Sequence, residues 1–336
     1  MQRFPVSDHS NGRTFHNPSA YRLSPAEQPR SGDPATDPGF SSILAWQTSL
    51  RPRWPNDFPA RKADPLPALQ PGQISASFIN HSSFVLRIGR KDQRPLVILT
   101  DPILSERCSP FRHFGPKRVI APGFDLSDIP TVDLILVSHC HYDHLDRPTL
   151  RQIARRDRPL CLAPLGNRRH LRGLPFSAIV TRDWWETVQF DTITVTVTPA
   201  LHGSARTPFD TDRALWGGFM LDTGARRVFF AGDTAHGHHW ADMERRLATP
   251  DLALLPIGAY EPVSLMRDVH MTPEQAVEAA IVLKAKRAVA MHFGTFQLTD
   301  EGYWEPGGRL ANCLNTIGRG SDWFTLPRPG ESLVIP

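Results

Sequence analysis

Residues 139–144 have the sequence His-Cys-His-Tyr-Asp-His and directly follow an apolar segment at 132–137. A continuous apolar segment of this length is typical of a strand that is buried on both faces of a sheet. Two histidines at positions i and i+2 can coordinate one metal ion at the end of such a strand. The adjacent aspartate and histidine can serve a second ion close by. The motif therefore predicts a two-ion site at the end of a buried strand.

The other apolar segments are short and alternate with helical patterns. We expect strands at residues 74–79, 84–88, 96–99, 132–137, 193–198, 228–231, 252–255 and 288–291. A helix is expected from Pro273 to about Lys284, because Thr272 suits the N-cap position, with proline at N1 and glutamine at N3. Strands and helices alternate in both halves of the chain, so the fold class is α/β, or α+β with two sheets.

Three further ligand-type residues each follow a predicted strand, namely His202, Asp233 and His292. Together with the motif they make a set of five histidines and two aspartates at strand ends, which suits a pair of ions. Three histidines can hold one ion, Asp143, His144 and His292 can hold the other, and Asp233 can bridge. Imidazole and carboxylate ligands without thiolate favour zinc, with manganese or iron as alternatives. We therefore expect two Zn²⁺ per chain.

Composition narrows the classes of function and location. The chain has 336 residues and a net charge of +4, without a run of five or six like charges, so nucleic-acid binding is not expected. The four cysteines form no Cys-x-x-Cys pair, which favours reduced thiols in a cytoplasmic protein. No segment approaches the ~18 apolar residues of a membrane span, and the first twenty residues contain no apolar signal region. We expect a cytoplasmic protein, with peripheral contact at the inner membrane surface left open.

Proline content separates the N-terminal part of the chain from the rest. Residues 1–70 hold 11 of the 32 prolines, which predicts an irregular arm that wraps a body formed by residues 71–336. An apolar island at residues 40–54 interrupts this arm. The island is expected to be a short amphipathic helix docked on the core, or else a patch that touches lipid or a partner.

The motif at 139–144, with the later His202, Asp233 and His292, resembles the metallo-β-lactamase superfamily. Several stretches are similar to one branch, the N-acyl-phosphatidylethanolamine-hydrolysing phospholipase D family: LTDPILSERCSPFRHFGPKRV, SHCHYDHLD, FAGDT, PIGAYEP, LMRDVHMTPEQAV and MHFGTF. The similarity runs from about residue 74 to 310. It implies a four-layer αββα sandwich, with a two-zinc site in the cleft between the sheets.

The resemblance also implies a role for each site residue. The first zinc would be held by His139, His141 and His202. The second would be held by Asp143, His144 and His292, with Asp233 bridging. Asp101 would orient metal ligands without touching the ions, as would His81, which lies in Asn-His-Ser-Ser where the family usually has Gly-His-Ala-Thr. His270 would contact the substrate phosphate or a developing negative charge.

The predicted reaction is hydrolysis, because two divalent cations lower the pKa of a bound water from ~15.7 to roughly 7. The nucleophile is then a metal-bound hydroxide, and Asp233 can take its proton. The family resemblance favours a phosphodiesterase of phospholipase D type, acting on N-acyl-phosphatidylethanolamine-like or other small-molecule or lipid phosphodiesters. The alternatives are a lactonase or other hydrolase of small acyl compounds, and a metal-binding protein without turnover. The oligomeric state is not predicted.

Some charged residues near these motifs are expected on the solvated surface, with the mouth of the cleft as the alternative. They are Lys117, Arg118, Arg206, His236, His238 and His239.

Overall fold

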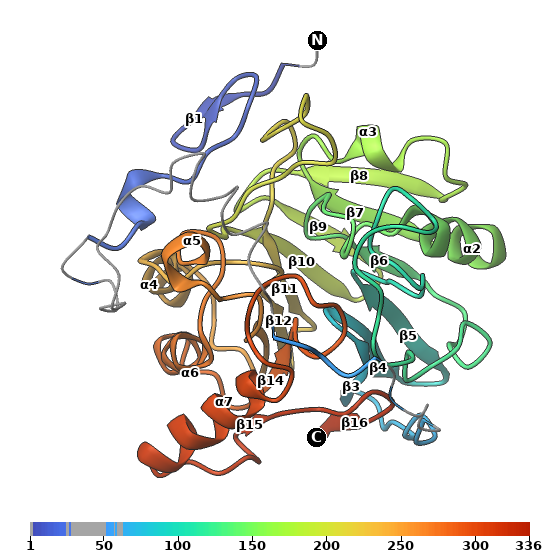
Figure 1. Ribbon diagram of the computed structural model, residues 1–336. Coiled ribbons are helices and arrows are strands. Elements are labelled where there is room, and N and C mark those ends of the chain that lie inside the picture. The colour runs from blue at the N-terminus through green and yellow to red at the C-terminus, as the bar shows by residue number, and fades with distance from the viewer. Residues whose placement is uncertain (1–2, 25–26, 28–51, 57, 59–62) are drawn as a thin grey trace.

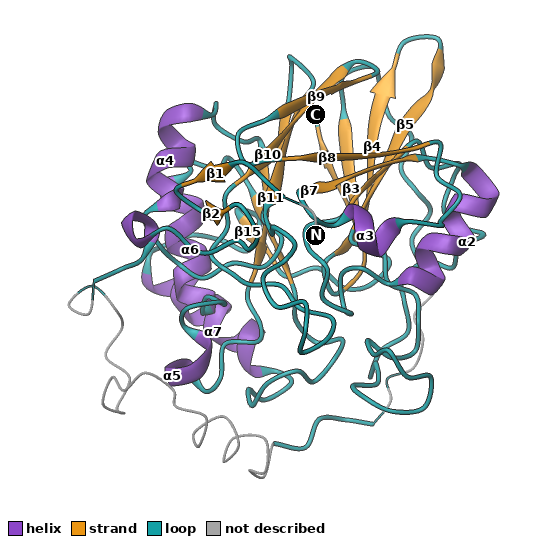
Figure 2. Cartoon of the chain, turned by 90° about the horizontal axis from the view of Figure 1, so that it is seen from above, coloured by secondary structure: helices purple, strands orange, loops and turns teal. Residues whose placement is uncertain are grey.

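The computed structural model describes residues 3–24, 27, 52–56, 58 and 63–336. Two mixed sheets face each other, with helices on the outer side of each (Figures 1 and 2). The first sheet has the order β16 (Ser332–Ile335), β3 (Ile74–Asn80), β4 (Ser83–Arg90), β5 (Gln93–Thr100), β6 (Leu134–Leu136), β7 (Leu160–Pro164) and β8 (Ala178–Arg182). The second has the order β15 (Phe324–Thr325), β14 (Ala288–Met291), β13 (Leu252–Pro256), β12 (Arg227–Phe230), β11 (Gly218–Asp222), β10 (Ile193–Thr198) and β9 (Thr187–Phe190).

The helices complete the outer layers. The first sheet is flanked by α2 (Arg147–Asp157) and α3 (Arg168–Leu171), and the second by α4 (His239–Arg246), α5 (Val263–Met266), α6 (Pro273–Val282) and α7 (Glu305–Thr316) (Figure 1). The helix expected from Pro273 is α6, and its N-cap Thr272 forms a capping box with Gln275. The expected αββα sandwich is confirmed. The strand expected over 132–137 is shorter in the structure and covers only β6.

Alternation along the strands builds two apolar layers. Leu134 and Leu136 of β6 belong to the large cluster that joins the two sheets. Ile135, between them, points the other way and belongs to a second cluster with Ile153 of α2. This period of two places every second residue of the strand against the opposite sheet and the others against the helix. The segment is therefore apolar throughout because both of its faces are buried.

Strand direction brings the predicted site residues to one edge of the sandwich. β3, β5 and β6 run in the same direction, since β3 and β5 are both antiparallel to β4 and β6 is parallel to β5. By the same reasoning β10, β12 and β14 share one direction in the second sheet. The residues that follow these strands are therefore gathered at carboxyl ends, where ligand sites of open sheets commonly form.

The described part of the N-terminal arm packs on the body. It contains the short strands β1 (Val6–Ser7) and β2 (Ser10–Asn11) and the 3₁₀ helix η1 (Ser19–Tyr21). Three of its aromatic side chains are buried in the large cluster, namely Phe4, Phe15 and Tyr21. Most of the apolar island at 40–54 lies outside the described residues. Trp54, at its end, is buried and donates a hydrogen bond to the Glu301 carbonyl at 2.8 Å. The boundary between arm and body stays a prediction.

The structure bears on the cysteines and on the residues expected at the surface. All four cysteines are free thiols, as expected. The surface prediction holds for Lys117 and His238, which are exposed. It is wrong for Arg118, whose buried guanidinium donates to the Ile103 and Ser105 carbonyls. It is also wrong for His239, which is fully buried.

One structural fact bears on membranes. Over the ranges given above, the structure contains no helix that is both long enough and apolar enough to cross a bilayer.

Candidate metal centre

The structure brings all ten predicted site residues together. Four overlapping groups of side chains have ligand atoms within 4.8 Å of one another: His81–Asp143–His144–His292, His139–His141–His202, Asp101–His139–His144 and His202–Asp233–His270. These residues come from loops of both sheets, as the strand directions require. His139, His144 and His202 each belong to two of these groups, so the groups adjoin one another, as the ligands of two neighbouring ions would.

Three histidine nitrogens converge in the first group. The His141 Nδ1 atom lies 2.9 Å from His139 Nε2 and 3.1 Å from His202 Nε2. Nitrogen ligands placed about 2.0–2.1 Å from a tetrahedral zinc are about 3.3 Å apart, so these spacings suit a common ion. The His202 ring is oriented by the Val269 carbonyl, which lies 2.8 Å from Nδ1 and leaves Nε2 free as a lone-pair donor.

The protonation state of this group also suits a metal ion. Burial, together with the neighbouring imidazole of His202, lowers the pKa of His141 to about 3. Burial and the nearby His144 lower the pKa of His139 well below its usual value. Both rings are therefore neutral near pH 7, which is the form that binds metals. Cys140, between them, packs in the second apolar cluster, and burial raises the pKa of its thiol to about 12.

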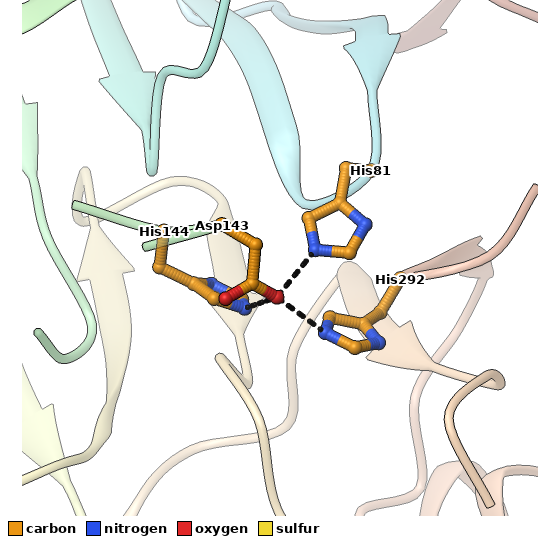
Figure 3. Close-up of side chains that lie close together, drawn as sticks. All are labelled: His81, Asp143, His144 and His292. Carbon is orange, nitrogen blue, oxygen red and sulfur yellow. Dashed lines mark hydrogen bonds and ion pairs between the residues drawn. The ribbon is translucent and has the colours of Figure 1, made fainter. Parts of the chain in front are cut away.

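The second group surrounds one oxygen of Asp143. Its Oδ2 atom lies 3.0 Å from His81 Nε2, 3.3 Å from His144 Nε2 and 3.4 Å from His292 Nε2 (Figure 3). Only the His81 contact has hydrogen-bond geometry. The Nε2 atoms of His144 and His292 are buried and have no hydrogen-bond partner among the described residues. Such orphaned nitrogens are costly unless a cation occupies the space in front of them, so this group fits a metal ion.

Asp233 lies between the two groups. Its Oδ2 atom is 3.0 Å from His292 Nε2, 3.1 Å from His144 Nε2 and 3.7 Å from His202 Nε2. Its Oδ1 atom is buried and lacks a hydrogen-bond partner within the described ranges. Burial opposes ionisation, but the charges of His144 and His292 hold the pKa of Asp233 well below its usual value. An ionised carboxylate in this position can face both ions.

Asp101 holds one of the histidines in place. Its Oδ2 atom accepts hydrogen bonds from His144 Nδ1 at 2.7 Å and from the Ser138 hydroxyl at 2.5 Å, and its Oδ1 accepts from the Ser138 amide at 2.7 Å. With Nδ1 of His144 committed to Asp101, Nε2 is the atom left for a metal. Carboxylates that orient a ligating imidazole in this way are common around metal sites.

His270 lies at the margin of the site. Its ring centroid is 5.0 Å from that of His202 and 5.3 Å from that of His292. It is only half-buried as a residue, but its Nδ1 atom is buried and has no partner in the described structure. Burial lowers the pKa of His270 well below its usual value. A neutral imidazole here can donate a hydrogen bond to an anionic group placed beside the ions.

Comparison with known proteins agrees with this geometry. A family model described as "Beta-lactamase superfamily domain" matches residues 97–293, more than half of the chain. The chain belongs to the metallo-β-lactamase superfamily. The matched range contains the motif at 139–144, as well as His202, Asp233 and His292.

Several relatives within the superfamily carry functional names. N-acyl-phosphatidylethanolamine-hydrolyzing phospholipase D 1 of Caenorhabditis elegans is 32% identical over 258 residues, covering 72% of this chain and 70% of its own length. A mitochondrial enzyme of the same name from Saccharomyces cerevisiae is 33% identical over 70% of this chain and 52% of its own. An uncharacterised protein of Mycobacterium tuberculosis is 35% identical over 75% of this chain and 68% of its own.

Solved structures share the fold. Igni18, a metallo hydrolase of Ignicoccus hospitalis, has a TM-score of 0.57 and 20% identity over 79% of this chain and 99% of its own. CmlA, a diiron β-hydroxylase of Streptomyces venezuelae, has the same TM-score and identity over 80% of this chain and 55% of its own. The fold alone therefore does not select the metal. Within the superfamily, the chain is a metal-dependent hydrolase, in agreement with its named relatives at 32–33% identity.

The backbone around the superfamily site is locally strained. His81, Asp101 and His292 have φ angles of 48°, 34° and 60°, which non-glycine residues rarely adopt. The His292 amide donates to the His81 carbonyl at 2.8 Å, and the His81 amide donates to the Thr295 hydroxyl at 3.0 Å. Strained residues of this kind cost about 1–3 kcal/mol each and persist where the surroundings fix them. One hydrogen bond therefore joins the backbones of the two histidines, and Thr295 holds the other side of His81.

Three supporting residues were not assigned a role from the sequence. Ser138 bonds to Asp101, and Gly258 packs against the His292 carbonyl, where an added Cβ would lie only 2.1 Å from the oxygen. Arg206 was expected on the surface, but its Nη1 atom donates to the Cys140 carbonyl at 2.7 Å and the Leu145 carbonyl at 2.9 Å. It therefore ties both ends of the loop that carries the motif. The only sequence signal for Gly258 was its place in PIGAYEP, where a glycine permits close backbone approach.

Proposed function

We propose that the protein is a two-zinc phosphodiesterase of phospholipase D type. In this proposal His139, His141 and His202 hold the first ion, Asp143, His144 and His292 hold the second, and Asp233 bridges them. The observation that carries it is the position of the Asp233 carboxylate, within 4 Å of nitrogens from both groups. The imidazole nitrogens and carboxylate oxygens of these residues make up the donor set that zinc prefers.

The roles of the chain's own residues follow from the site. A pair of bound divalent cations supplies an acidified water and binds the oxygens of a phosphoryl group. Asp233 accepts a proton from the attacking water at its carboxylate, and this proton can pass to the alcohol that leaves when the phosphorus–oxygen ester bond breaks. His81 donates from Nε2 to Asp143 and keeps that carboxylate turned toward the ions. His270 donates a hydrogen bond to a phosphoryl oxygen, which stabilises the negative charge that builds in the transition state.

The substrate class that we propose is an N-acyl-phosphatidylethanolamine-like or other phosphodiester. It is supported by the names of relatives at 32–33% identity. A phosphodiester anion also suits a dinuclear cation site, which can hold both non-bridging oxygens.

The reaction class can be tested with ¹⁸O-labelled water. The purified zinc-loaded protein is offered N-acyl-phosphatidylethanolamine vesicles, soluble phosphodiesters and a set of lactones. We expect label in the phosphomonoester product and none in the released alcohol. Rapid opening of lactones, with every phosphodiester left intact, would overturn the phosphodiesterase proposal and leave only the hydrolase assignment.

His270→Ala should separate catalysis from metal binding. We expect the variant to keep both ions and to lose about 10²–10⁴-fold in kcat, as is typical for a positioned proton donor. Elemental analysis and steady-state kinetics measure the two effects. His238→Ala is the matched control, because His238 is exposed and pairs only loosely with Glu27 at 3.5 Å. Normal turnover with a lowered melting temperature would assign His270 a structural role instead.

We also propose peripheral contact with an anionic lipid surface. Phe111 and Phe114 are 65% and 74% exposed in the loop at 105–117, which also bears the exposed residues Arg112 and His113. The same loop carries Cys108, which packs in one cluster with Tyr142 of the metal motif. Exposed aromatic rings beside basic side chains are suited to a membrane interface.

The test is sedimentation with phosphatidylglycerol vesicles. The double variant Phe111→Ser with Phe114→Ser should bind at least about tenfold more weakly, because each ring contributes roughly 1.5 kcal/mol or more when buried. Val6→Ser is the control, since Val6 is 78% exposed on β1, outside this loop. Equal vesicle binding by all three proteins would rule out this loop as the contact.

A further inference from the structure

Asn17 of the N-terminal arm bonds directly to the backbone of His202. Its Oδ1 atom accepts a hydrogen bond from the His202 amide at 3.2 Å, and its Nδ2 atom donates to the His202 carbonyl at 2.9 Å. Trp216 Nε1 also donates to Asn17 Oδ1, at 3.1 Å. Two donors thus face the oxygen and one acceptor faces the nitrogen, so the orientation of the carboxamide is fixed.

The arm that carries Asn17 is itself anchored on both sides. The Phe15 amide donates to the Asp212 carbonyl at 2.8 Å, and the His238 amide donates to the Tyr21 carbonyl at 2.8 Å. The rings of Phe15 and Tyr21 are buried in the large apolar cluster. Asn17 therefore lies between two anchored residues, Phe15 and Tyr21. Its hydrogen bonds to His202 can restrict the position of the loop after β10.

We propose that Asn17 is a positioning residue of the metal centre, and that the N-terminal arm is for this reason a functional part of the site. The proposal rests on the proposed role of His202 as a ligand. The His202 ring is oriented at Nδ1 by the Val269 carbonyl, and Asn17 fixes the backbone that carries the ring. Both restraints are needed to aim Nε2 at one point, because ring orientation alone does not place the Cα atom.

The position of Asn17 makes this support unexpected. Residue 17 lies far outside the range 97–293 that matches the superfamily domain. Its sequence context, His-Asn-Pro, contains no metal-binding pattern. The support arises only because the arm crosses the loop after β10, 185 residues away along the chain.

Zinc retention by Asn17→Ala tests the proposal. The matched control is Asn11→Ala, because Asn11 lies in the same arm and bonds only within it, to the Arg13 and Thr14 amides and the Thr14 hydroxyl. Zinc affinity is measured by competition with a chromophoric chelator. Loss of a group that orients a ligand typically weakens metal binding by about 10–100-fold. We expect this loss for one of the two ions in Asn17→Ala and no change in Asn11→Ala.

Melting temperatures with and without zinc distinguish positioning from general stability. A purely structural Asn17 would lower both melting temperatures equally and leave zinc affinity unchanged, and that result would overturn the proposal. A positioning Asn17 reduces the increase in melting temperature that zinc produces. Asn17→Asp is a second variant in case the alanine variant does not fold. It keeps the acceptor for the His202 amide, but sets a carboxylate oxygen against the His202 carbonyl, so it should also bind zinc more weakly.

The zinc content of the unmodified protein distinguishes a wrong role for Asn17 from a wrong two-zinc proposal. If the unmodified protein binds no zinc, the two-zinc proposal is wrong. If it binds two ions, and Asn17→Ala binds them as tightly as Asn11→Ala does, only the role of Asn17 is wrong.

Discussion

Replacing Asp233 with asparagine should lower kcat by roughly 10⁴-fold or more, because the change removes both a proton acceptor and a negative charge from between the two groups of ligands. The amide is neutral and offers one oxygen instead of two. We therefore also expect metal content to fall from close to two ions per chain toward one. Elemental analysis of protein dialysed against metal-free buffer, followed by kinetics at saturating zinc, measures both effects.

Asp251→Asn is a matched control for this experiment. Asp251 is also buried, but it pairs with Lys286 at 2.8 Å and accepts from the Arg227 amide, as part of the structure around β12 and β13. We expect this variant to keep two ions and full activity. If Asp233→Asn also kept two tightly bound ions and its turnover, Asp233 would not be the bridging ligand.

Replacing Gly258 with alanine should damage the second half of the site through the backbone. The added Cβ would lie 2.1 Å from the His292 carbonyl oxygen and 3.2 Å from Phe293 Cα, and neither backbone atom can move cheaply. Overpacking of this kind costs about 1–3 kcal/mol. We expect the free energy of unfolding to fall by about this amount, and the ion beside His292 to be lost on dialysis. Chemical denaturation and elemental analysis measure the two effects.

Gly308→Ala provides the opposite outcome for comparison. Gly308 lies inside α7, and a Cβ added there would have no described atom within 4 Å other than those of its chain neighbours and the backbone of its own helix. Alanine in an exposed helical position should stabilise the protein by about 0.5–1 kcal/mol. A Gly258→Ala variant that gained stability in the same way, and kept both ions, would show that the loop at 256–262 does not fix His292.

The sequence predicted the composition of the candidate site, because ligand chemistry is local. The run at 139–144 places four ligand-type side chains on one short segment, and no partner is needed to recognise it. His202, Asp233 and His292 were found because each follows an apolar segment that forms a strand. The alternation of strands and helices also predicted the fold class. Each of these inferences uses residues close in sequence, where periodicity and side-chain type carry the information.

Tertiary structure alone decided which groups support the ligands. The side-chain carboxamide of Asn17 bonds to His202, 185 residues away along the chain. The Arg206 guanidinium bonds to the Cys140 carbonyl, 66 residues away. Arg206 was expected in solvent because an arginine in a loop is usually exposed. A hydrogen bond to a backbone carbonyl leaves no mark on the sequence of the accepting segment, since every residue type offers the same carbonyl. The candidate ligands could therefore be recognised in the sequence, whereas the contacts that orient them depend on how distant segments of the chain cross.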